Sequence, residues 1–339
     1  MIKNSFNIPL FYPNVSDSMR HAAYESLGER FIGQGKTVED FEMLLGNYLR
    51  VQHVLTVNSG TSALELAYHL LDLKPGDEVI TPVYTCTATN IPLVRRNVKI
   101  IFADVKDNLL MDWDDVEKKI SKKTKAIINV HLFNQLNEHR NLGIPIIGDA
   151  AQYLGETHGE RLTAYSFQAT KILTTVDGGA LICKRRKDYN RAKLLRWYGI
   201  DRETSKNNID MDITEAGYKY SMNNVTAAIG IAGLNDLKKI HPKVLSLQKR
   251  YEKLLGFQGG SPFLIHSKNR KKLAAKLAAQ GIETSLVHKR NDRYSLFGGK
   301  RQNLPNMNRL ESTYLFLPCH SHLTMENVEF ICNTVKKYL

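Results

Sequence analysis

The sequence has 339 residues, of which 42% are hydrophobic and 24% charged, and its net charge is +13. This length and balance exclude a disordered chain and favour a large domain with a smaller companion. No stretch approaches the roughly 20 apolar residues of a membrane helix, and the first 14 residues lack the apolar run of a signal peptide, so we expect a cytoplasmic protein without membrane contact. The four cysteines are scattered without a CxxC pair, which indicates a reducing compartment and no metal site.

The positive charge favours a polyanionic partner, either a nucleic acid or a nucleotide diphosphate. Basic residues cluster at 118–125, 184–196 and 268–272, and each cluster is typical of a helix surface or a flanking turn. The sequence has no RNP-like aromatic motif and no zinc-finger spacing. Solvated helix faces therefore explain the charge better than a nucleic-acid groove, and we expect no nucleic-acid partner.

Apolar runs of strand length alternate with amphipathic helical stretches, which predicts an α/β fold with a mostly parallel central sheet flanked by helices. A helical pattern covers residues 223–240, and the composition changes near 256–262. We therefore expect a large domain of residues 1–240, including an amino-terminal arm, and a small α+β domain of residues 241–339. The predicted strands of the sheet are residues 53–57, 78–81, 98–105, 126–132, 144–147, 165–168 and 179–183.

Three features of the large domain point to pyridoxal phosphate (PLP). A turn of small residues precedes a helix at 58–62, Asp149 follows an apolar strand, and Lys171 follows a strand that contains Ser166. PLP enzymes need helix N–H groups for the phosphate, a carboxylate for the pyridine nitrogen, and a lysine amine for the aldehyde. Each feature alone is weak, because such turns and acids often serve only as helix caps.

Four segments resemble consecutive blocks of the DegT-type (StrS-like) sugar aminotransferases, which are fold type I PLP enzymes. They are VNSGTSALELAYHLLDLKPGDEVITP, IPIIGDAAQYLG, YSFQATKILTTVDGGALIC and GYKYSMNNVTAAIGIAGL. Matching blocks run from about Phe31 to the carboxyl terminus. The resemblance implies a PLP cofactor that becomes pyridoxamine phosphate during the reaction, and a homodimer with shared active sites.

The resemblance also implies roles for individual residues. Lys171 matches the lysine that forms the Schiff base, and Asp149 matches the carboxylate that pairs with the pyridinium nitrogen. Gln152 matches a residue close to the ring, and Ser166 a hydroxyl that binds the phosphate. The phosphate turn corresponds to Gly60, Thr61 and Ser62.

Two positions depart from the family's commonest pattern. Lys219 stands where many members have an asparagine that reaches the phosphate in the neighbouring subunit, although other members have lysine there; a plain surface lysine is an equally good interpretation. Cys86 stands among the cofactor-contacting positions where relatives often have an aromatic residue that stacks on the ring. We expect Cys86 to be a buried, unreactive thiol, with stacking weaker or supplied elsewhere.

The segment SLVHKRNDRYSLF resembles the small-domain segment that family members turn toward the sugar nucleotide. An arginine fork suits a diphosphate, and polar side chains suit sugar hydroxyls. A polar loop without a ligand explains the same residues nearly as well. The candidate substrate-binding residues are His288, Arg290, Asn291 and Asp292.

The expected reaction moves an amino group from L-glutamate to a nucleotide-linked keto-6-deoxy sugar, at position 4 or alternatively at position 3. Lys171 would act as the proton shuttle, which requires that burial or a nearby cation lower the pKa of its amine. A dehydratase of the same family would carry histidine in place of Lys171, so the lysine argues against that activity. A PLP-binding regulator or nucleic-acid-binding protein is a further alternative, suggested by the charge alone.

Overall fold

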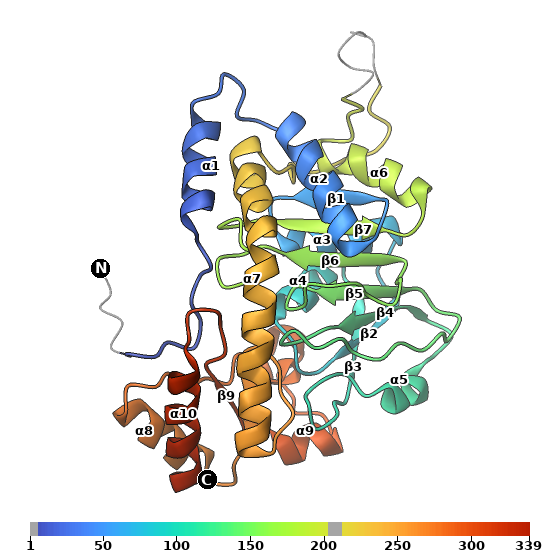
Figure 1. Ribbon diagram of the computed structural model, residues 1–339. Coiled ribbons are helices and arrows are strands. Elements are labelled where there is room, and N and C mark those ends of the chain that lie inside the picture. Colours follow the sequence, from blue (N-terminus) through green and yellow to red (C-terminus); the bar gives the residue numbers. More distant parts are fainter. Residues whose placement is uncertain (1–5, 203–211) are drawn as a thin grey trace.

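In the computed structural model, which describes residues 6–202 and 212–339, a seven-stranded sheet forms the centre of the protein (Figure 1). Its order is β1-β7-β6-β5-β4-β2-β3. Only β7 runs against its neighbours β1 and β6, so the predicted mostly parallel sheet is confirmed. The strands are β1 (Val54–Val57), β2 (Glu78–Pro82), β3 (Lys99–Ala103), β4 (Thr124–Val130), β5 (Ile146–Ala150), β6 (Leu162–Ser166) and β7 (Gly179–Cys183).

Helices cover both faces of this sheet because its strands are apolar on both sides. On one face lie α3 (Gly60–Leu70), α4 (Thr87–Arg95) and α6 (Arg186–Arg196). The other face packs against α2 (Lys36–Leu49) and the long α7 (Asn224–Leu255), with α5 (Trp113–Lys119) further along the sheet. In β1, successive residues Val54 and Leu55 belong to opposite cores, as the two-residue period of a strand requires.

The carboxyl-terminal part builds a second core around a two-stranded antiparallel sheet. That core also takes in the second half of α7, which runs through both parts of the molecule (Figure 1). The helix α1 (Asp17–Leu27) packs along the first half of α7. The remaining elements are β8 (Phe263–His266), α8 (Arg270–Ala279), the 3-10 turns η1 (Asn291–Arg293) and η2 (Ser295–Phe297), α9 (Pro305–Leu310), β9 (Tyr314–Leu317) and α10 (Met325–Tyr338).

The predicted end of a helix at residue 240 is wrong, because α7 continues through Pro242 to Leu255. It ends at Gly256, whose φ of 74° is the left-handed conformation that glycine adopts readily. The amino-terminal segment also differs from the expected grouping, since Ile8 pairs with Ile282 and belongs to the carboxyl-terminal core. The boundary between the two domains therefore stays a prediction.

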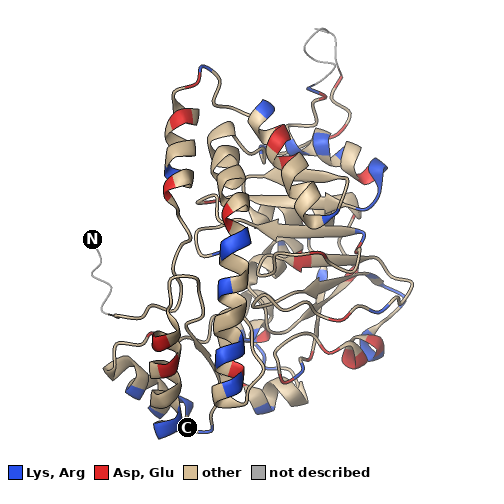
Figure 2. Ribbon diagram, in the orientation of Figure 1, with Lys and Arg blue, Asp and Glu red and all other residues tan. Residues whose placement is uncertain are grey.

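Basic residues recur along the lower half of α7 (Figure 2), and the lysines of this helix are exposed. In the basic clusters, Lys119 pairs with Asp115, and Arg191 pairs with Asp72 and Glu215. These contacts match the predicted solvated faces. Within the described ranges, no helix is long and apolar enough to cross a membrane.

Candidate active site

The start of α3 meets the end of β6 at the carboxyl edge of the parallel strands, where ligands collect in α/β folds. A Cβ atom at Gly60 would lie 2.7 Å from the Cβ of Ser166, so glycine is required for this close approach. Ser59 caps the helix by accepting a hydrogen bond of 3.1 Å from the backbone N–H of Ser62. Thr61 lies in the same first turn. The result is a helix N-terminus beside a hydroxyl, which suits an anion such as phosphate.

Asp149 lies in β5, where its side chain is buried with 3% of its surface exposed. Burial raises the pKa of this carboxyl group. One carboxylate oxygen accepts a hydrogen bond of 2.7 Å from the hydroxyl of Thr89. The other oxygen accepts a hydrogen bond of 3.1 Å from the backbone N–H of Ala151. Both hydrogen bonds lower the pKa of Asp149. No salt bridge to Asp149 forms within residues 6–202 and 212–339. The charge of Lys171 also lowers this pKa but does not outweigh the effect of burial, so a protonated pyridine ring beside the carboxylate would further stabilise its charged form.

Lys171 lies in the connection between β6 and β7, where its backbone N–H donates 2.9 Å to the carbonyl oxygen of Gln168. Burial lowers the pKa of its amine, while the charges of Asp149 and Cys86 raise it. The desolvation expected from the sequence is therefore confirmed in direction. An amine with a lowered pKa is unprotonated more often near neutral pH, as nucleophilic attack and proton transfer both require.

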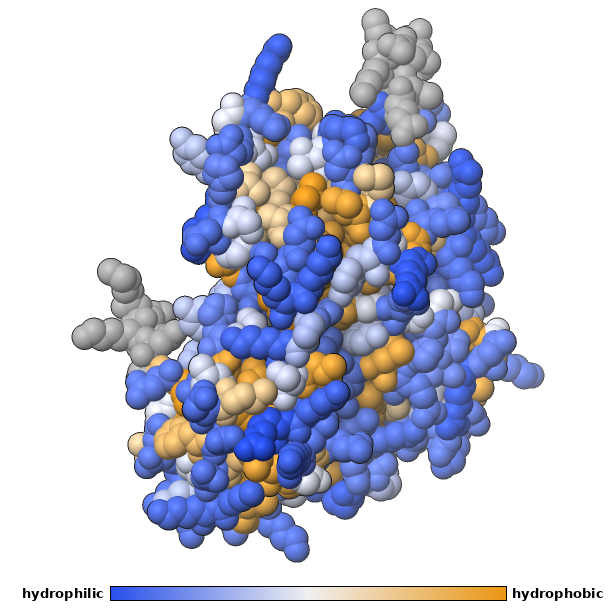
Figure 3. Space-filling model, viewed as in Figure 1, coloured by the Kyte–Doolittle hydropathy of each residue, from blue (hydrophilic) through white to orange (hydrophobic). Residues whose placement is uncertain are grey.

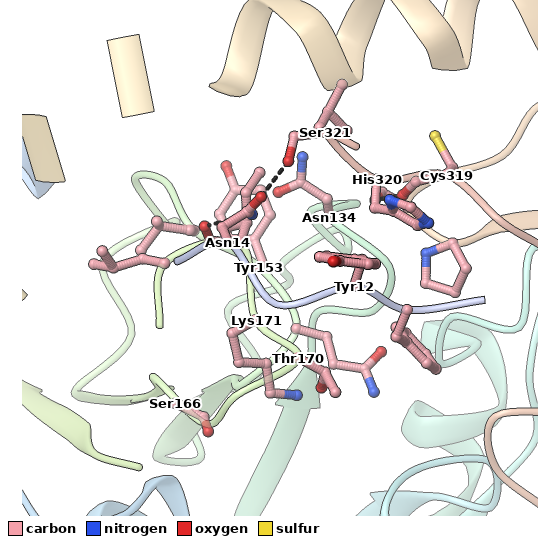
Figure 4. Close-up of a pocket in the computed structure, with 18 of the residues that line it drawn as sticks. Tyr12, Asn14, Asn134, Tyr153, Ser166, Thr170, Lys171, Cys319, His320 and Ser321 are labelled. Atoms are coloured by element: carbon pink, nitrogen blue, oxygen red, sulfur yellow. Dashed lines mark hydrogen bonds between the residues drawn. The ribbon is translucent and has the colours of Figure 1, made fainter. Parts of the chain in front are cut away.

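Lys171 and Ser166 both line a pocket of about 230 Å³ (Figure 4). The amino-terminal segment closes one side: Ser321 Oγ donates to Asn14, which in turn donates 3.1 Å to the carbonyl oxygen of Ile172. Tyr12 crosses the pocket in the same view. Three distant parts of the chain thus enclose the lysine.

Gln152 and His288 face the same pocket as Lys171. The Nε2 atoms of Gln152 and His288 are 2.6 Å apart. Burial lowers the pKa of His288 to about 4, and the charge of Lys171 adds to this effect. Gln152, Ser166, Lys171 and His288 thus line one pocket, and Asp149 lies close enough to Lys171 for its charge to raise the pKa of the lysine; their roles in a single site stay a prediction.

Two predicted cofactor contacts lie at the margin of this site. Cys86 is exposed and precedes α4, so the expectation of a buried thiol is wrong. It lines a small pocket together with His288. Lys219 is exposed, with its ammonium 3.0 Å from the hydroxyl of Ser221 and 4.1 Å from the centre of the Trp197 ring. Its contact with a neighbouring subunit stays a prediction.

Arg290, Asn291 and Asp292 are buried, with at most 1% of each residue exposed. The guanidinium of Arg290 donates two hydrogen bonds, of 2.7 and 2.6 Å, to the carboxylate of Asp292. The side chain of Asn291 donates 2.8 Å to the carbonyl oxygen of Thr85. The structure therefore gives these three residues a role in holding their segment in place, and leaves direct substrate contact a prediction that would require these bonds to open.

Several residues of the site were not predicted from the sequence. Thr89 lies 60 positions before the carboxylate that it contacts, and only the threonine repeat at positions 85, 87 and 89 hinted at a polar helix start. Tyr12 and Asn14 belong to an arm whose sequence gave no chemical signal. No group of histidines, cysteines and acids suited to a metal ion occurs in the described part of the chain.

A buried carboxylate, a desolvated lysine and a glycine-containing helix start together define the class of PLP-dependent aminotransferases. Comparison with known proteins agrees, because the model of the DegT/DnrJ/EryC1/StrS aminotransferase family matches residues 14–336. The chain belongs to this family and is a PLP-dependent sugar aminotransferase.

The chain is 29% identical to the UDP-4-amino-4,6-dideoxy-N-acetyl-beta-L-altrosamine transaminase of Campylobacter jejuni, over 96% of this chain and 95% of that protein. It is 28% identical to the GDP-perosamine synthase of Vibrio cholerae, over 77% of this chain and 74% of that protein. The crystal structure of AtS13 from Actinomadura melliaura is 31% identical, with a TM-score of 0.91 over 98% of this chain and 99% of that one.

Replacing Thr89 with valine tests the support of Asp149. The hydroxyl lowers the pKa of Asp149, so its loss raises that pKa further. We expect kcat/KM to fall about tenfold, the effect of one lost hydrogen bond to a charged group, and its acidic limb to move to higher pH. Thr334→Val on α10 is the control, because that hydroxyl donates to the carbonyl of Phe330 within its own helix. An unchanged pH profile in Thr89→Val would contradict the assigned support.

His320 makes the stability of the fold depend on pH. Its pKa is lowered to about 4 by burial, opposed by a hydrogen bond of 3.0 Å to the carbonyl of Pro9. The unfolded chain therefore binds more protons between pH 4 and about 6.5, and the free energy of unfolding falls as the pH drops through this range. Urea unfolding at pH 7 and pH 5 should show a larger loss for the wild type than for His320→Gln, whose amide still donates to Pro9. Equal losses would remove His320 from this effect.

Proposed function

We propose that this protein moves the amino group of L-glutamate to a nucleotide-linked keto-6-deoxy sugar, at position 4 in preference to position 3. The observation that carries the proposal is the buried Asp149 carboxylate close enough to the Lys171 amine for the charge of each to shift the pKa of the other, in a chain that matches a nucleotide-sugar transaminase along nearly its whole length. The name of the Campylobacter jejuni relative supports position 4, since it is a transaminase for a UDP-linked 4-amino-4,6-dideoxy sugar. The Vibrio cholerae relative, a GDP-perosamine synthase, supports a nucleotide-linked sugar. The net charge of +13 suits a substrate that carries a diphosphate.

The residues of the site fit the cofactor part by part. The amine of Lys171 would bind its aldehyde, Asp149 its ring nitrogen, and Ser166 with the first turn of α3 its phosphate. When bound, PLP supplies an electron sink for the negative charge that develops at the substrate carbon. Gln152 lies in the same pocket, where it would contact the ring.

The protein's own groups contribute proton transfer and exclusion of water. Because burial lowers its pKa, the Lys171 amine can take a proton from the substrate carbon and return it. The hydrogen bonds from Thr89 and Ala151 fix the orientation of the Asp149 carboxyl group and favour its charged form. Tyr12 and Asn14 cover the pocket from the amino-terminal segment and limit the access of water.

We further propose a homodimer that shares its active sites. Apolar surface lies where α1, α2 and the upper end of α7 meet (Figure 3). Along α1, α2 and the chain between them, Tyr24, Leu27, Phe31 and Met43 are 57–75% exposed. Apolar side chains gathered in this way favour a covering partner. Lys219 is exposed and would reach the cofactor phosphate of the second copy.

Incubation with PLP, L-glutamate and a panel of nucleotide-linked keto-6-deoxy sugars tests the activity. We expect an amino-sugar product from a 4-keto substrate, identified by mass spectrometry with the position read by NMR. Lys171→Ala should be folded and inactive, because it lacks the amine that binds the cofactor. Borohydride should fix PLP on the Lys171 peptide of the wild type. A label on another peptide, or turnover by Lys171→Ala, would overturn the proposal.

Mixing two inactive variants tests the shared site. We expect Lys219→Ala to retain cofactor poorly, because the phosphate loses a cation, and Lys171→Ala to be inactive. In a mixed dimer one site carries both defects and the other neither, so equal co-expression should restore about a quarter of wild-type activity. A monomer in light scattering, or a mixture no more active than its parts, would refute the shared dimer.

A further inference from the structure

The segment that carries His288 is fastened to the connection between β2 and α4. The hydroxyl of Tyr84 donates 2.7 Å to the carbonyl oxygen of Leu286. Farther along, the backbone N–H of Asn291 donates 2.7 Å to the carbonyl of Val83, and its side chain donates to Thr85. Tyr84 and Asn291 have no exposed surface. Residues 286–291 are thus held at both ends by buried hydrogen bonds.

Between these two attachments the backbone makes a strained turn. The N–H of His288 donates 2.6 Å to the carbonyl of Leu286, two residues back, and the intervening Val287 has a φ of 55°. A β-branched residue rarely adopts this left-handed conformation, and such strain persists only where the surroundings enforce it. The turn places Val287 and His288 on the wall of the pocket that Lys171 also lines.

Aromatic rings pack against the imidazole of His288. Its ring lies edge-on to Tyr84, with centroids 5.8 Å apart, and stacks near Phe133 at 6.5 Å. The hydroxyl of Tyr314 donates 3.2 Å to the His288 carbonyl. The ring therefore has little freedom to turn away from the pocket.

The contact between His288 and Gln152 has one chemically consistent arrangement. The backbone N–H of Phe133 donates to the Oε1 of Gln152, with the two heavy atoms 3.4 Å apart. If the oxygen and nitrogen of the Gln152 side chain were exchanged, its NH2 group would face this N–H, and two donors would meet. The Nε2 amide of Gln152 must then donate to the Nε2 of His288, which lies 2.6 Å away. His288 is therefore an acceptor at Nε2 and carries its proton on Nδ1.

We propose that His288 is a positioning residue, which as a neutral hydrogen-bond acceptor fixes the carboxamide of Gln152 beside Lys171. This inference rests on the proposed cofactor at Lys171. The Oε1 of Gln152 accepts from the N–H of Phe133, and its Nε2 donates to His288, so the carboxamide is held in one plane. The second N–H of Nε2 is then left to bind the cofactor. The lowered pKa of His288, about 4, keeps its acceptor nitrogen free of a proton at neutral pH.

A double-mutant cycle tests whether His288 acts through Gln152. His288→Phe keeps the ring and removes the acceptor, and Gln152→Ala removes the amide. We expect each substitution to lower kcat about tenfold and to shift the visible absorption and circular dichroism of bound PLP. The kcat of the double variant should be no lower than that of the less active single variant. Arg293→Ala, an exposed neighbour paired with Glu311, is the control and should change neither. Additive losses, or an unchanged cofactor spectrum in His288→Phe, would overturn the proposal.

A second measurement needs neither cofactor nor a folded variant. Nitrogen-15 NMR of histidine-labelled wild-type protein at pH 7 should show His288 with a bare Nε2 and a protonated Nδ1. A protonated Nε2 would overturn the inference even if the variants failed to fold. A wild type that binds PLP and aminates no keto-sugar would refute the proposed substrate alone, because the spectra and NMR are read without substrate.

Discussion

The active site depends on a buried carboxylate, that of Asp149, whose pKa is raised by burial. Asp149 lies in β5, a strand between β4 and β6 of the sheet, and among the described residues it accepts hydrogen bonds from the Thr89 hydroxyl and the Ala151 amide. These two donors and the nearby charge of Lys171 lower the pKa but do not outweigh the loss of hydration. A positive ring against the carboxylate would stabilise its charged form further.

The other groups of the site are arranged around this charge by the two cores of the protein. The sheet supplies Asp149 and Ser166, and the loop after β6 supplies Lys171, whose amine shares the same desolvated surroundings. The long helix α7 joins the sheet's core to the carboxyl-terminal core, so the walls from both parts keep their relative positions. The segment that bears His288 is held against these walls by a hydrogen bond from the Tyr84 hydroxyl to the carbonyl of Leu286.

The sequence was most informative where the signal was local. Apolar runs of strand length predicted all seven strands within a few residues. The family blocks pointed to Asp149, Ser166 and Lys171, whose roles stay a prediction. The end of α7 was missed because the helical pattern recognised in the sequence stops at residue 240, whereas packing of Val244 and Leu247 into the second core carries the helix on to Leu255.

Long-range contacts were beyond the reach of sequence patterns. Arg290, Asn291 and Asp292 were expected to bind a ligand, and the structure adds that they are buried, with hydrogen-bond partners that include Thr85 and Asn308. Their contact with a ligand stays a prediction. Nothing in the order of residues distinguishes a buried bidentate pair from a binding fork, because both need the same side chains. Exposure of Cys86 was likewise invisible, since it depends on where the start of α4 meets the pocket.

The charge state of the bound ring is the most direct test of this account. Protein loaded with PLP labelled with nitrogen-15 in its ring should show, by NMR at pH 8, a protonated pyridine nitrogen in the wild type, and an unprotonated one when Asp149 is replaced by asparagine. An unprotonated ring nitrogen in the wild type would contradict the claim that Asp149 is buried in order to hold that cation.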